Sequence, residues 1–426
     1  MTAMTNRREV RVLVVGQGYV GLPLAMRAVE VGHTVCGYDA DPGRVARLVA
    51  GESYVEDISD ERLRAAIATG RYSASSDPGC CTGFDVAVVT VPTPLREGLP
   101  DLSYIERAAE TIGAHLRPGN TAVLESTTYP GTTEELFGPI LERESGLTAG
   151  QDFFLGYSPE RIDPGNPLWD LVNTPKVVSG IDAASLAAVQ GFYDTLVDKT
   201  FPVSGCKEAE LTKLLENTFR HVNVALVNEL AMFASDLGID VWEAIDAASS
   251  KPFGFMSFRP GPGVGGHCLP IDPSYLSWRV KRQLGESFRF VELANDINDH
   301  MPAYVVQRVQ VALNRFERAV KGSRILLLGL AYKRNTSDDR ESPAVVVADR
   351  LVALGAHVRV ADPHVVGQHA DERVVRVELK ADEVEAADLV VVLTDHDAFD
   401  YELLGGARHV LDTRRRLDPA PNVEYL

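Results

Sequence analysis

Residues 10–21 read VRVLVVGQGYVG and join an apolar run directly to a glycine-rich turn. The run Val10–Val15 predicts a buried parallel strand, and the residues after the turn predict a helix. In such a Gly-x-Gly-x-x-Gly turn, Gly16 forms the tight bend, Gly18 lets a pyrophosphate approach, and Gly21 lets the helix pack on the strand. The helix N-terminus then offers N–H donors to the phosphates. The stretch predicts a dinucleotide site; a bare turn without a ligand is the alternative.

A second predicted strand, residues 33–39, ends in an acid. Asp39 stands 18 residues after Gly21, where a carboxylate binds the two ribose hydroxyls of an adenosine. Since the 2′-phosphate of NADP would meet that carboxylate, the sequence favours NAD as the cofactor.

Alternating strands and helices continue to about residue 200. Strands are predicted at 84–91, 121–128 and 152–157, and helices at 61–69 and 105–116. The carboxyl ends of parallel strands form the edge where ligands of open α/β sheets bind. Polar residues that follow these strands include Thr93, Thr127, Glu160 and Arg161. For the Glu160–Arg161 pair, a solvated ion pair is the alternative interpretation.

A long helix is predicted over residues 207–237, with Gly238 as its stop signal. Lys213, Asn217 and Arg220 fall at positions i, i+4 and i+7 and share one face of it. That face is a candidate site, and a solvated polar stripe is the alternative. Shorter helices are predicted at 241–248, about 273–283 and 291–316.

Residues 259–272, RPGPGVGGHCLPID, place one cysteine directly after a loop of four glycines and two prolines. Thiolate is the reactive form of cysteine, and exposed backbone N–H groups favour it. Cys268 is therefore a candidate nucleophile, with Asp272 four residues downstream. A buried structural cysteine beside a turn is the alternative.

A second α/β unit begins at residues 323–331 but lacks the glycine pattern of the first. The loop after it carries Lys333, Arg334 and Arg340 among many hydroxyl and amide donors, ahead of a helix starting near Pro343. This composition predicts a pyrophosphate site for a ligand other than the dinucleotide. Strands are predicted at 356–361, 374–378, 389–393 and 409–411.

The composition excludes several classes of protein. A net charge of -18 argues against a general nucleic-acid binder and requires local positive sites for any anionic ligand. Five cysteines without framework spacing indicate reduced thiols and a cytoplasmic protein. No stretch reaches 18 uninterrupted apolar residues, so no membrane span is expected. No metal site is expected either.

A dinucleotide site, a second anion site and a cysteine between them suggest an oxidoreductase with a covalent intermediate. A nicotinamide cofactor alone takes an alcohol to an aldehyde. Cys268 could trap that aldehyde as a thiohemiacetal, which loses a second hydride to give a thioester for hydrolysis. This chemistry predicts two NAD reduced per substrate and no free aldehyde.

Seven motifs follow one another along the chain. They are Gly16–Ala25, Val91–Pro94, Glu125–Thr127, Ser158–Arg161, Lys213–Asn217, Gly265–Cys268 and Arg340–Ser342. Through them the chain resembles the UDP-glucose/GDP-mannose dehydrogenase family over nearly its full length. Residues Lys251–Phe255 and Pro260–Pro273 are most similar to one branch of that family. That branch oxidises C6 of UDP-N-acetylglucosamine or UDP-N-acetylmannosamine to the uronic acid.

The resemblance implies catalytic roles. Cys268 matches the nucleophile. Lys213 and Asn217 match the residues that stabilise developing oxyanions and hold the catalytic water. Asp272 matches the acid that works with that water, and Glu160 matches a general acid/base.

The resemblance also implies ligand contacts. The NAD contacts are Gly16, Gly18, Tyr19, Val20, Gly21, Asp39, Arg44, Thr93, Thr127 and Arg340. The substrate contacts are Glu160, Arg161, Lys213, Asn217, Arg220, Arg259, Gly265 and Lys333. Arg259 is a departure, because relatives in this branch often carry an aromatic residue there.

The implied fold is α/β, with two Rossmann-like domains joined by an all-helical central domain that contains a long spine helix. The NAD-binding domain is expected at 1–204, the helical dimerisation domain with the cysteine loop at 205–318, and the nucleotide-sugar domain at 319–426. A homodimer or higher homo-oligomer is expected.

The implied activity is NAD-dependent oxidation of UDP-N-acetylglucosamine. UDP-N-acetylmannosamine and UDP-glucose are alternatives, because one hydroxyl or acetamido pocket decides between them. A two-electron dehydrogenase would leave Cys268 unexplained, and a non-catalytic binder of NAD and nucleotide sugar would need no nucleophile. The pathway served, whether polysaccharide, glycolipid or antibiotic sugar, stays open.

Overall fold

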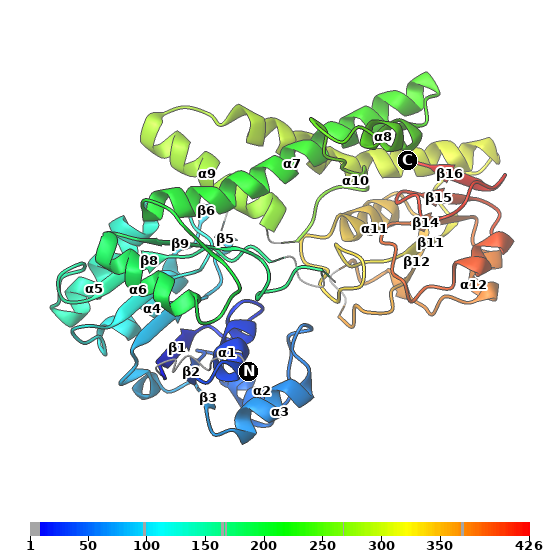
Figure 1. The fold of residues 1–426 in the computed structure, drawn as a ribbon. Coiled ribbons are helices and arrows are strands. Elements are labelled where there is room, and N and C mark those ends of the chain that lie inside the picture. The colour runs from blue at the N-terminus through cyan, green and yellow to red at the C-terminus, as the bar shows by residue number, and fades with distance from the viewer. Residues whose placement is uncertain (1–8, 97–98, 163–165, 167, 267, 368–369) are drawn as a thin grey trace. The chain divides into compact units, whose positions relative to one another are not determined.

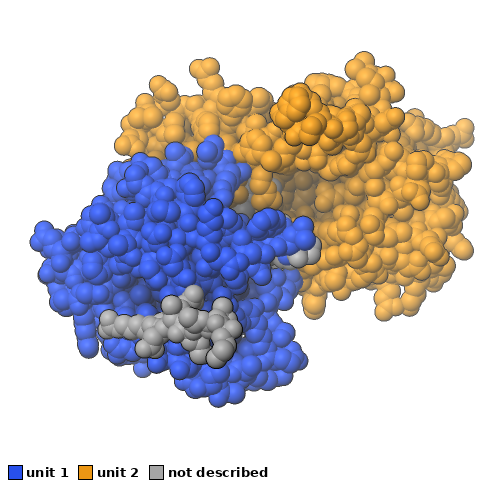
Figure 2. Space-filling model, viewed as in Figure 1, with its two compact units in different colours: residues 1–216 blue, residues 217–426 orange. Residues whose placement is uncertain are grey.

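The structure of the chain is a computed structural model that describes residues 9–96, 99–162, 166, 168–266, 268–367 and 370–426 (Figure 1). Of Cys268, Leu269 and Pro270 only the backbone is described, and His267 lies outside the described residues. The chain divides into two compact units, Met1–Glu216 and Asn217–Leu426, coloured separately in Figure 2. Each unit is described by itself below.

The first unit alternates strands and helices along the chain. Its elements are β1 (Arg11–Val15), α1 (Gly21–Glu30), β2 (Thr34–Tyr38), α2 (Pro42–Val49), α3 (Asp60–Ala68), β3 (Tyr72–Ser75), the 3-10 helix η1 (Pro78–Cys81), β4 (Val86–Val89), β5 (Leu95–Arg96), β6 (Leu99–Pro100), α4 (Ser103–Gly113), β7 (Thr121–Leu124), the π-helix η2 (Thr133–Phe137), α5 (Gly138–Ser145), β8 (Phe154–Tyr157), β9 (Lys176–Gly180), α6 (Ala183–Tyr193) and β10 (Thr200–Pro202).

The main sheet of this unit has the order β10-β9-β8-β7-β4-β1-β2-β3 and is parallel except between β8 and β9. Successive residues of each central strand enter different cores. Val12 and Val14 of β1 pack with α1 and α6, whereas Leu13 and Val15 pack with α4 and α5. Helices therefore cover both faces, which explains why the strands read as continuous apolar runs. The chain reverses its direction of travel across the sheet between β1 and β4, where open α/β sheets bind ligands.

The second unit contains helices followed by a smaller sheet. Its elements are α8 (Val241–Ser249), α9 (Cys268–Leu284), α10 (Arg289–Arg315), β11 (Arg324–Leu328), α11 (Pro343–Ala353), β12 (His357–Ala361), β13 (Val375–Arg376), α12 (Ala381–Ala386), β14 (Leu389–Val392), the 3-10 helix η3 (Tyr401–Gly406), β15 (Val410–Asp412) and β16 (Val423–Tyr425). The helix α7 (Cys206–Leu237) precedes them and crosses the boundary between the units.

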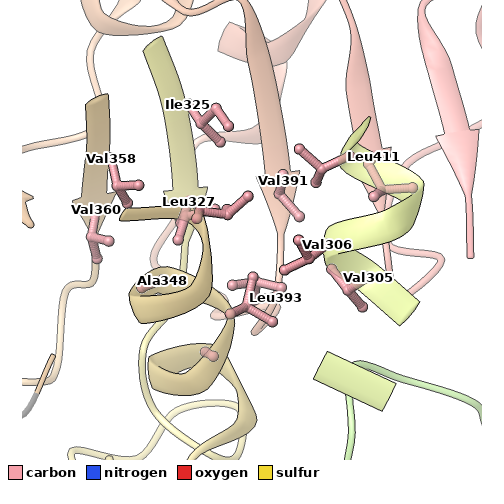
Figure 3. Close-up of a cluster of buried hydrophobic side chains, with 14 of the residues drawn as sticks. Val305, Val306, Ile325, Leu327, Ala348, Val358, Val360, Val391, Leu393 and Leu411 are labelled. Atoms are coloured by element: carbon pink, nitrogen blue, oxygen red, sulfur yellow. The ribbon is translucent and has the colours of Figure 1, made fainter. Parts of the chain in front are cut away.

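The sheet of the second unit is parallel throughout, in the order β13-β12-β11-β14-β15-β16. One of its faces carries Ile325, Leu327 and Val391, which point toward α10 and α11 (Figure 3). Val305 of α10 and Ala348 of α11 complete this core, and all five side chains are buried.

The predicted fold class is confirmed, with a parallel sheet towards each end of the chain and a helical region between them in sequence. The long helix predicted at 207–237 is α7, which has 32 residues. The residue ranges predicted for the three domains stay a prediction. Within the described residues, no helix combines the length and the apolar character needed to cross a membrane.

Two details of the sequence analysis were wrong or incomplete. The helix predicted from about residue 273 begins at Cys268, so the cysteine lies at a helix N-terminus and not in the loop. Pro270 falls in the first turn, where a helix has no use for backbone N–H groups, and the helix continues through Pro273. Several elements were not predicted: the strands β3, β5, β6, β9, β10 and β16 and the helices α2, α5, α6 and α12.

Candidate functional site

The glycine-rich turn after β1 has the conformation that a dinucleotide needs. Gly16 has a φ of 94°, and a Cβ atom there would lie 2.8 Å from the carbonyl oxygen of Thr90. A Cβ atom on Gly21 would overlap the carbonyl oxygen of Gly16. At Gly18, in contrast, no other described atom lies within 4 Å of a Cβ position. Gly16 and Gly21 are therefore required for packing, whereas Gly18 leaves open space for a ligand.

Gln17 anchors this turn from inside, a role that the sequence analysis missed. Its side chain is buried, donates from Nε2 to the Val14 carbonyl oxygen at 2.9 Å, and accepts from the Tyr72 hydroxyl at 2.9 Å. The Tyr54 hydroxyl donates to the backbone carbonyl of Gln17 at 2.7 Å. These bonds hold the turn whether or not a ligand is bound.

Asp39 follows β2 and faces the same turn. Its carboxylate accepts the N–H of Gln17 at 2.9 Å and the N–H of Asp41 at 3.0 Å. Arg44 lies 3.8 Å from the Oδ2 atom, close enough to compensate part of the charge. The carboxylate is oriented by these contacts and retains acceptor capacity for ribose hydroxyls.

The N-terminus of α1 faces the pyrophosphate position. Val20 is its N-cap residue and provides no side-chain cap, so the first N–H groups of the helix keep no internal side-chain acceptor. Tyr19 beside it is 42% exposed. Together with the space at Gly18 and the orientation of Asp39, this geometry fits NAD.

The strand ends β4 and β7 supply two hydroxyl groups. Thr93 follows β4 and Thr127 follows β7, and both are half-buried. Lys213 of α7 donates from Nζ to Thr127 Oγ1 at 2.5 Å. The structure therefore brings a predicted cofactor contact and a predicted catalytic lysine together.

Glu160 lies after β8, in a buried position with every oxygen engaged. Its Oε1 accepts the N–H groups of Arg161 at 2.6 Å and Ile162 at 2.8 Å, and its Oε2 accepts from Lys176 Nζ at 2.8 Å. Burial alone would raise the pKa of Glu160, but the Lys176 ammonium and the hydrogen bonds that Glu160 accepts together outweigh burial and hold that pKa well below the usual range. These contacts favour the ionised form of Glu160.

Arg161 is engaged by the protein itself. Its guanidinium pairs with both oxygens of Glu216 on α7, at 2.5 and 3.1 Å, and donates to the Pro175 carbonyl at 2.8 Å. A bidentate pair of this kind fixes the loop after β8 against α7. All three guanidinium nitrogens of Arg161 are engaged in these contacts, and its contact with a substrate stays a prediction.

In the second unit, Asn217 of α7 donates from Nδ2 to Asp272 Oδ2 at 2.6 Å. Both side chains are buried. Asp272 lies four residues after Cys268 in α9, about one helical turn along the backbone. The helix N-terminus at Cys268 is a place that favours thiolate over thiol.

Three other predicted substrate contacts have different surroundings. Arg220 is exposed on α7. Arg259 forms an ion pair with Asp246 and lies over the Trp242 ring, with its guanidinium carbon 5.9 Å from the ring centroid. At Gly265 a Cβ atom would lie 2.8 Å from Tyr332 Cβ, so this glycine serves close packing in the same unit.

The loop after β11 holds the remaining predicted cations. Lys333 is half-buried. Arg340 pairs with Asp338 at 2.6 Å and is 48% exposed. Its neighbour Glu341 has a φ of 52°, a left-handed conformation that is unusual for a residue other than glycine.

Glu210 of α7 is a second buried group that the sequence analysis missed. Its carboxylate accepts the N–H of Gly131 at 2.5 Å and both the N–H and the hydroxyl of Thr133, at 2.9 and 2.7 Å. It thereby fixes the segment after Thr127 to the helix that carries Lys213. Burial raises the pKa of Glu210 to about 7.

Comparison with known proteins gives a consistent result along the chain. Models of the UDP-glucose/GDP-mannose dehydrogenase family match as the NAD binding domain at residues 10–197, the central domain at 207–300 and the UDP binding domain at 326–419. The chain is 35% identical to the UDP-N-acetyl-D-mannosamine dehydrogenase of Pyrococcus horikoshii, over 96% of this chain and 97% of that protein.

It is 37% identical to the UDP-N-acetyl-D-glucosamine 6-dehydrogenase of Pseudomonas aeruginosa, over 96% of this chain and 98% of that protein. A solved structure of the UDP-D-ManNAc dehydrogenase from Pyrococcus horikoshii has a TM-score of 0.88 and 33% identity, covering 97% of this chain and 98% of that one. Relatives named for two different sugars are thus about equally similar, and identity does not choose between them.

Proposed function

The chain belongs to the UDP-glucose/GDP-mannose dehydrogenase family, and on that premise we propose that it oxidises C6 of UDP-N-acetylglucosamine to the uronic acid. It is an NAD-dependent oxidoreductase that acts on a nucleotide sugar. The choice of an N-acetylated sugar rests on the residues around the cysteine, Lys251–Phe255 and Pro260–Pro273, and the choice of the gluco epimer rests on the relative from Pseudomonas aeruginosa alone.

The proposed chemistry uses Cys268 as a covalent nucleophile. When bound, NAD accepts one hydride in each of the two oxidations. The Cys268 thiolate adds to the C6 aldehyde, and the resulting thiohemiacetal loses hydride to become a thioester. Water then cleaves the thioester, which releases the uronic acid and returns the thiol. Both oxidations are complete before the product leaves, so two NADH form per sugar.

Four side chains of this chain assist Cys268. Lys213 and Asn217 stabilise the oxyanions that form when sulfur and then water add to C6. Asp272 positions the water, and Glu160 takes part in the proton transfers. The observation that carries the proposal is the buried hydrogen bond between Asn217 and Asp272, one helical turn beyond Cys268. A protein that only binds ligands has no use for a buried polar pair one helical turn from a cysteine in the sequence of α9.

We also propose that two copies of the chain pair through α7. Large apolar side chains recur along one stripe of this helix and are exposed: Leu211, Leu215, Phe219, Leu226, Leu230, Phe233 and Leu237. A stripe of this size is more than a monomer usually exposes, and a two-fold axis would set it against its own copy. The equilibrium mass in solution tests this, with Leu230→Glu as the variant expected to give monomers. An unchanged dimer in that variant would contradict pairing through α7.

The enzymatic proposal is tested by supplying UDP-N-acetylglucosamine, UDP-N-acetylmannosamine, UDP-glucose and UDP-galactose in parallel and counting NADH per sugar consumed. Two NADH with UDP-N-acetylglucosamine favoured supports the proposal. Two NADH with another sugar favoured would identify that sugar as the substrate and would still support the mechanism. One NADH per sugar removes the thioester, and no NADH with any sugar removes the proposed activity.

The role of the thiol is tested with Cys268→Ser, using Cys80→Ser as the matched control. Removal of the nucleophile is expected to lower kcat by about three orders of magnitude or more while NAD still binds. Cys80 is a half-buried thiol of η1, and its replacement is expected to leave kcat within about threefold. Equal activity of the two variants would contradict the thioester mechanism.

A further inference from the structure

Four buried side chains of the first unit form one connected network around Glu160. Glu125 follows β7, Lys176 begins β9, and Tyr193 ends α6. Lys176 Nζ contacts Glu160 Oε2 at 2.8 Å and also pairs with Glu125 Oε1. The Tyr193 hydroxyl donates to Glu125 Oε2 at 2.6 Å. At most 6% of any of these charged side chains is exposed.

The charges in this network do not balance. Two carboxylates share one ammonium, so full ionisation would leave one uncompensated negative charge in a dry interior. Such a charge is costly unless it is neutralised by a proton. A buried ion pair that served only stability would need a single carboxylate. The second carboxylate therefore needs another explanation.

The hydrogen bonds decide which carboxylate carries the proton. Glu160 accepts from three N–H donors, the backbone groups of Arg161 and Ile162 and the ammonium of Lys176. Glu125 accepts from Lys176 and the Tyr193 hydroxyl, and its carboxyl group also hydrogen-bonds to Glu160. More donors stabilise the ionised form, so Glu160 keeps its charge and Glu125 is the group that protonates.

The direction of the pKa shifts agrees with this geometry. Burial raises the pKa of Glu125 to about 7, with Glu160 adding to the rise, while Lys176 opposes it. Burial would lower the pKa of Lys176, but the two carboxylates outweigh it and raise that pKa. Burial raises the pKa of Tyr193 well above its usual value, which keeps its hydroxyl a donor.

We propose that Lys176 and Glu125 are positioning residues that hold Glu160 as an oriented carboxylate, so that it serves the reaction as an acceptor and not as an acid. This inference rests on the proposed function, because it assigns Glu160 a state within that reaction. Glu125 is the carboxyl group of the network that binds the proton, so Glu160 remains ionised.

The other charged groups near Glu160 do not replace Lys176. Arg161 is adjacent in sequence, but its guanidinium is turned to Glu216 on α7 in a bidentate pair. Lys213, also on α7, donates to Thr127. The packed elements β7, β9 and α6 contribute Glu125, Lys176 and Tyr193, and among the described contacts of Glu160 only Lys176 brings a positive charge.

The test compares pH profiles of kcat/KM for Lys176→Met, Glu125→Gln and the double variant, with Tyr193→Phe as the control. Lys176→Met leaves two buried carboxylates without a cation, so Glu160 protonates more easily. The acidic limb of its profile is expected to move up by at least about one pH unit, with at least about tenfold lower activity near neutrality that recovers at higher pH.

Glu125→Gln leaves a neutral Lys176–Glu160 pair, so its limb is expected to stay in place or move down. The double variant is expected to lie between the two single variants, since only the Glu160 charge remains. Tyr193→Phe removes a hydroxyl that touches Glu125 and not Glu160. Its profile is expected to match the original within about 0.3 pH units.

Uniformly lower kcat/KM in Lys176→Met at every pH, with an unmoved limb, would overturn the inference and leave a merely structural role. The free energy of unfolding gives a readout that does not need turnover. In Lys176→Met, two buried carboxylates favour protons, so stability is expected to increase as pH falls from about 8 to about 5. Stability that is independent of pH in that range would also overturn the inference.

These readouts separate the inference from the proposed function. Absence of NADH from the original protein would remove the function, while the stability profiles would still report on the network. Normal turnover with unmoved profiles would remove the inference alone. Should Lys176→Met fail to fold, the shape-conserving Glu125→Gln decides, because a limb that moves up in that variant contradicts the assignment of the proton to Glu125.

Discussion

The two α/β units build a similar turn after the first strand of each main sheet, but they use the aspartate that follows the second strand differently. In the first unit Gly16 follows β1 with a φ of 94°, and in the second Gly329 follows β11 with a φ of 89°. Each turn is closed by a threonine at the end of the neighbouring strand. Thr90 donates to the Gly16 carbonyl at 2.8 Å, and Thr394 donates to the Ala331 carbonyl at 2.6 Å.

The aspartate that follows the second strand shows the difference. Asp39 accepts two backbone N–H groups and has room beside Gly18. Asp362 accepts four, from Leu330 at 2.6 Å, Ala331 at 3.1 Å, His364 at 2.8 Å and Val365 at 2.9 Å.

Asp362 also contacts His396 Nε2 at 3.1 Å, and its side chain is 0% exposed. Its acceptor capacity is used up by the protein. The aspartate at this position therefore keeps acceptor capacity for a cofactor in the first unit, whereas in the second unit it only stabilises the protein itself. The number of backbone N–H groups that each aspartate accepts distinguishes Asp39 from Asp362.

The largest expected effect comes from Asp362→Ala compared with Asp39→Ala. The first change leaves four partly buried N–H groups without their acceptor and is expected to cost about 3–5 kcal/mol in the second unit. The second is expected to cost about 1–2 kcal/mol and to weaken NAD binding at least about tenfold. Hydrogen exchange measured for each unit, with an NAD titration, checks both. Similar losses of stability in the two variants would break the comparison.

Next in size is Gly329→Ala compared with Gly18→Ala. A Cβ atom at Gly329 would lie 2.6 Å from the Thr394 carbonyl oxygen at a left-handed φ, so we expect a loss of about 2–4 kcal/mol. Gly18 has open space around it, so Gly18→Ala is expected to change stability by less than about 0.5 kcal/mol. The added methyl group would instead obstruct the pyrophosphate and weaken NAD binding. Thermal unfolding and the same titration measure these outcomes.

The third prediction concerns the stability of the second unit at acidic pH, which depends on Asp362. Burial would raise the pKa of Asp362, but the hydrogen bonds from His396 and the backbone outweigh it and lower that pKa below its ordinary value of 3.8. A lowered pKa contributes stability that is present above the ordinary value and is lost as pH falls toward the lower one. The second unit is therefore expected to lose stability below about pH 4. Asp362→Asn should remove this dependence, and a slope unchanged in that variant would contradict it.

The smallest expected effect separates the two threonines. Thr90 donates to Val15 and Gly16 carbonyls at 3.0 and 2.8 Å, whereas Thr394 donates to Ala331 at 2.6 Å. Replacing either by valine keeps the shape and removes the hydroxyl, with an expected cost of about 1 kcal/mol. NAD affinity should fall only in Thr90→Val, because Thr90 belongs to the turn of the NAD-binding domain. A fall in neither variant would mean that Thr90 does not shape the cofactor turn.

The sequence was sufficient for the first turn because each of its residues has a local conformational task. Gly16, Gly21 and Asp39 could be assigned from spacing alone, and the long helix α7 from its apolar period. Lys213 and Asn217 were predicted to share one face of α7 as site residues. Lys213 contacts Thr127 and Asn217 contacts Asp272, which is consistent with that prediction. Their catalytic roles stay predictions.

The sequence was insufficient where a residue depends on distant partners. Lys176 stands at the head of an apolar strand and resembles a surface residue until Glu125 and Glu160 are placed beside it. Arg259 was expected to hold the substrate, and only the structure shows its pairing with Asp246. The helix after the glycine-rich loop was predicted to begin near residue 273, but α9 begins at Cys268, because a proline in the first turn costs a helix little.

The strand order of the first sheet has a consequence for how the chain folds during synthesis. Its members run from β1 to β10 and end at Pro202, and nearly all neighbours are parallel and joined by crossovers. Such pairings join residues far apart in the chain and form slowly. All of them are complete in sequence before Arg324 begins the second sheet. The ribosome therefore delivers the first sheet with a long interval to assemble alone, whereas refolding of the full-length chain must form both sheets in competition.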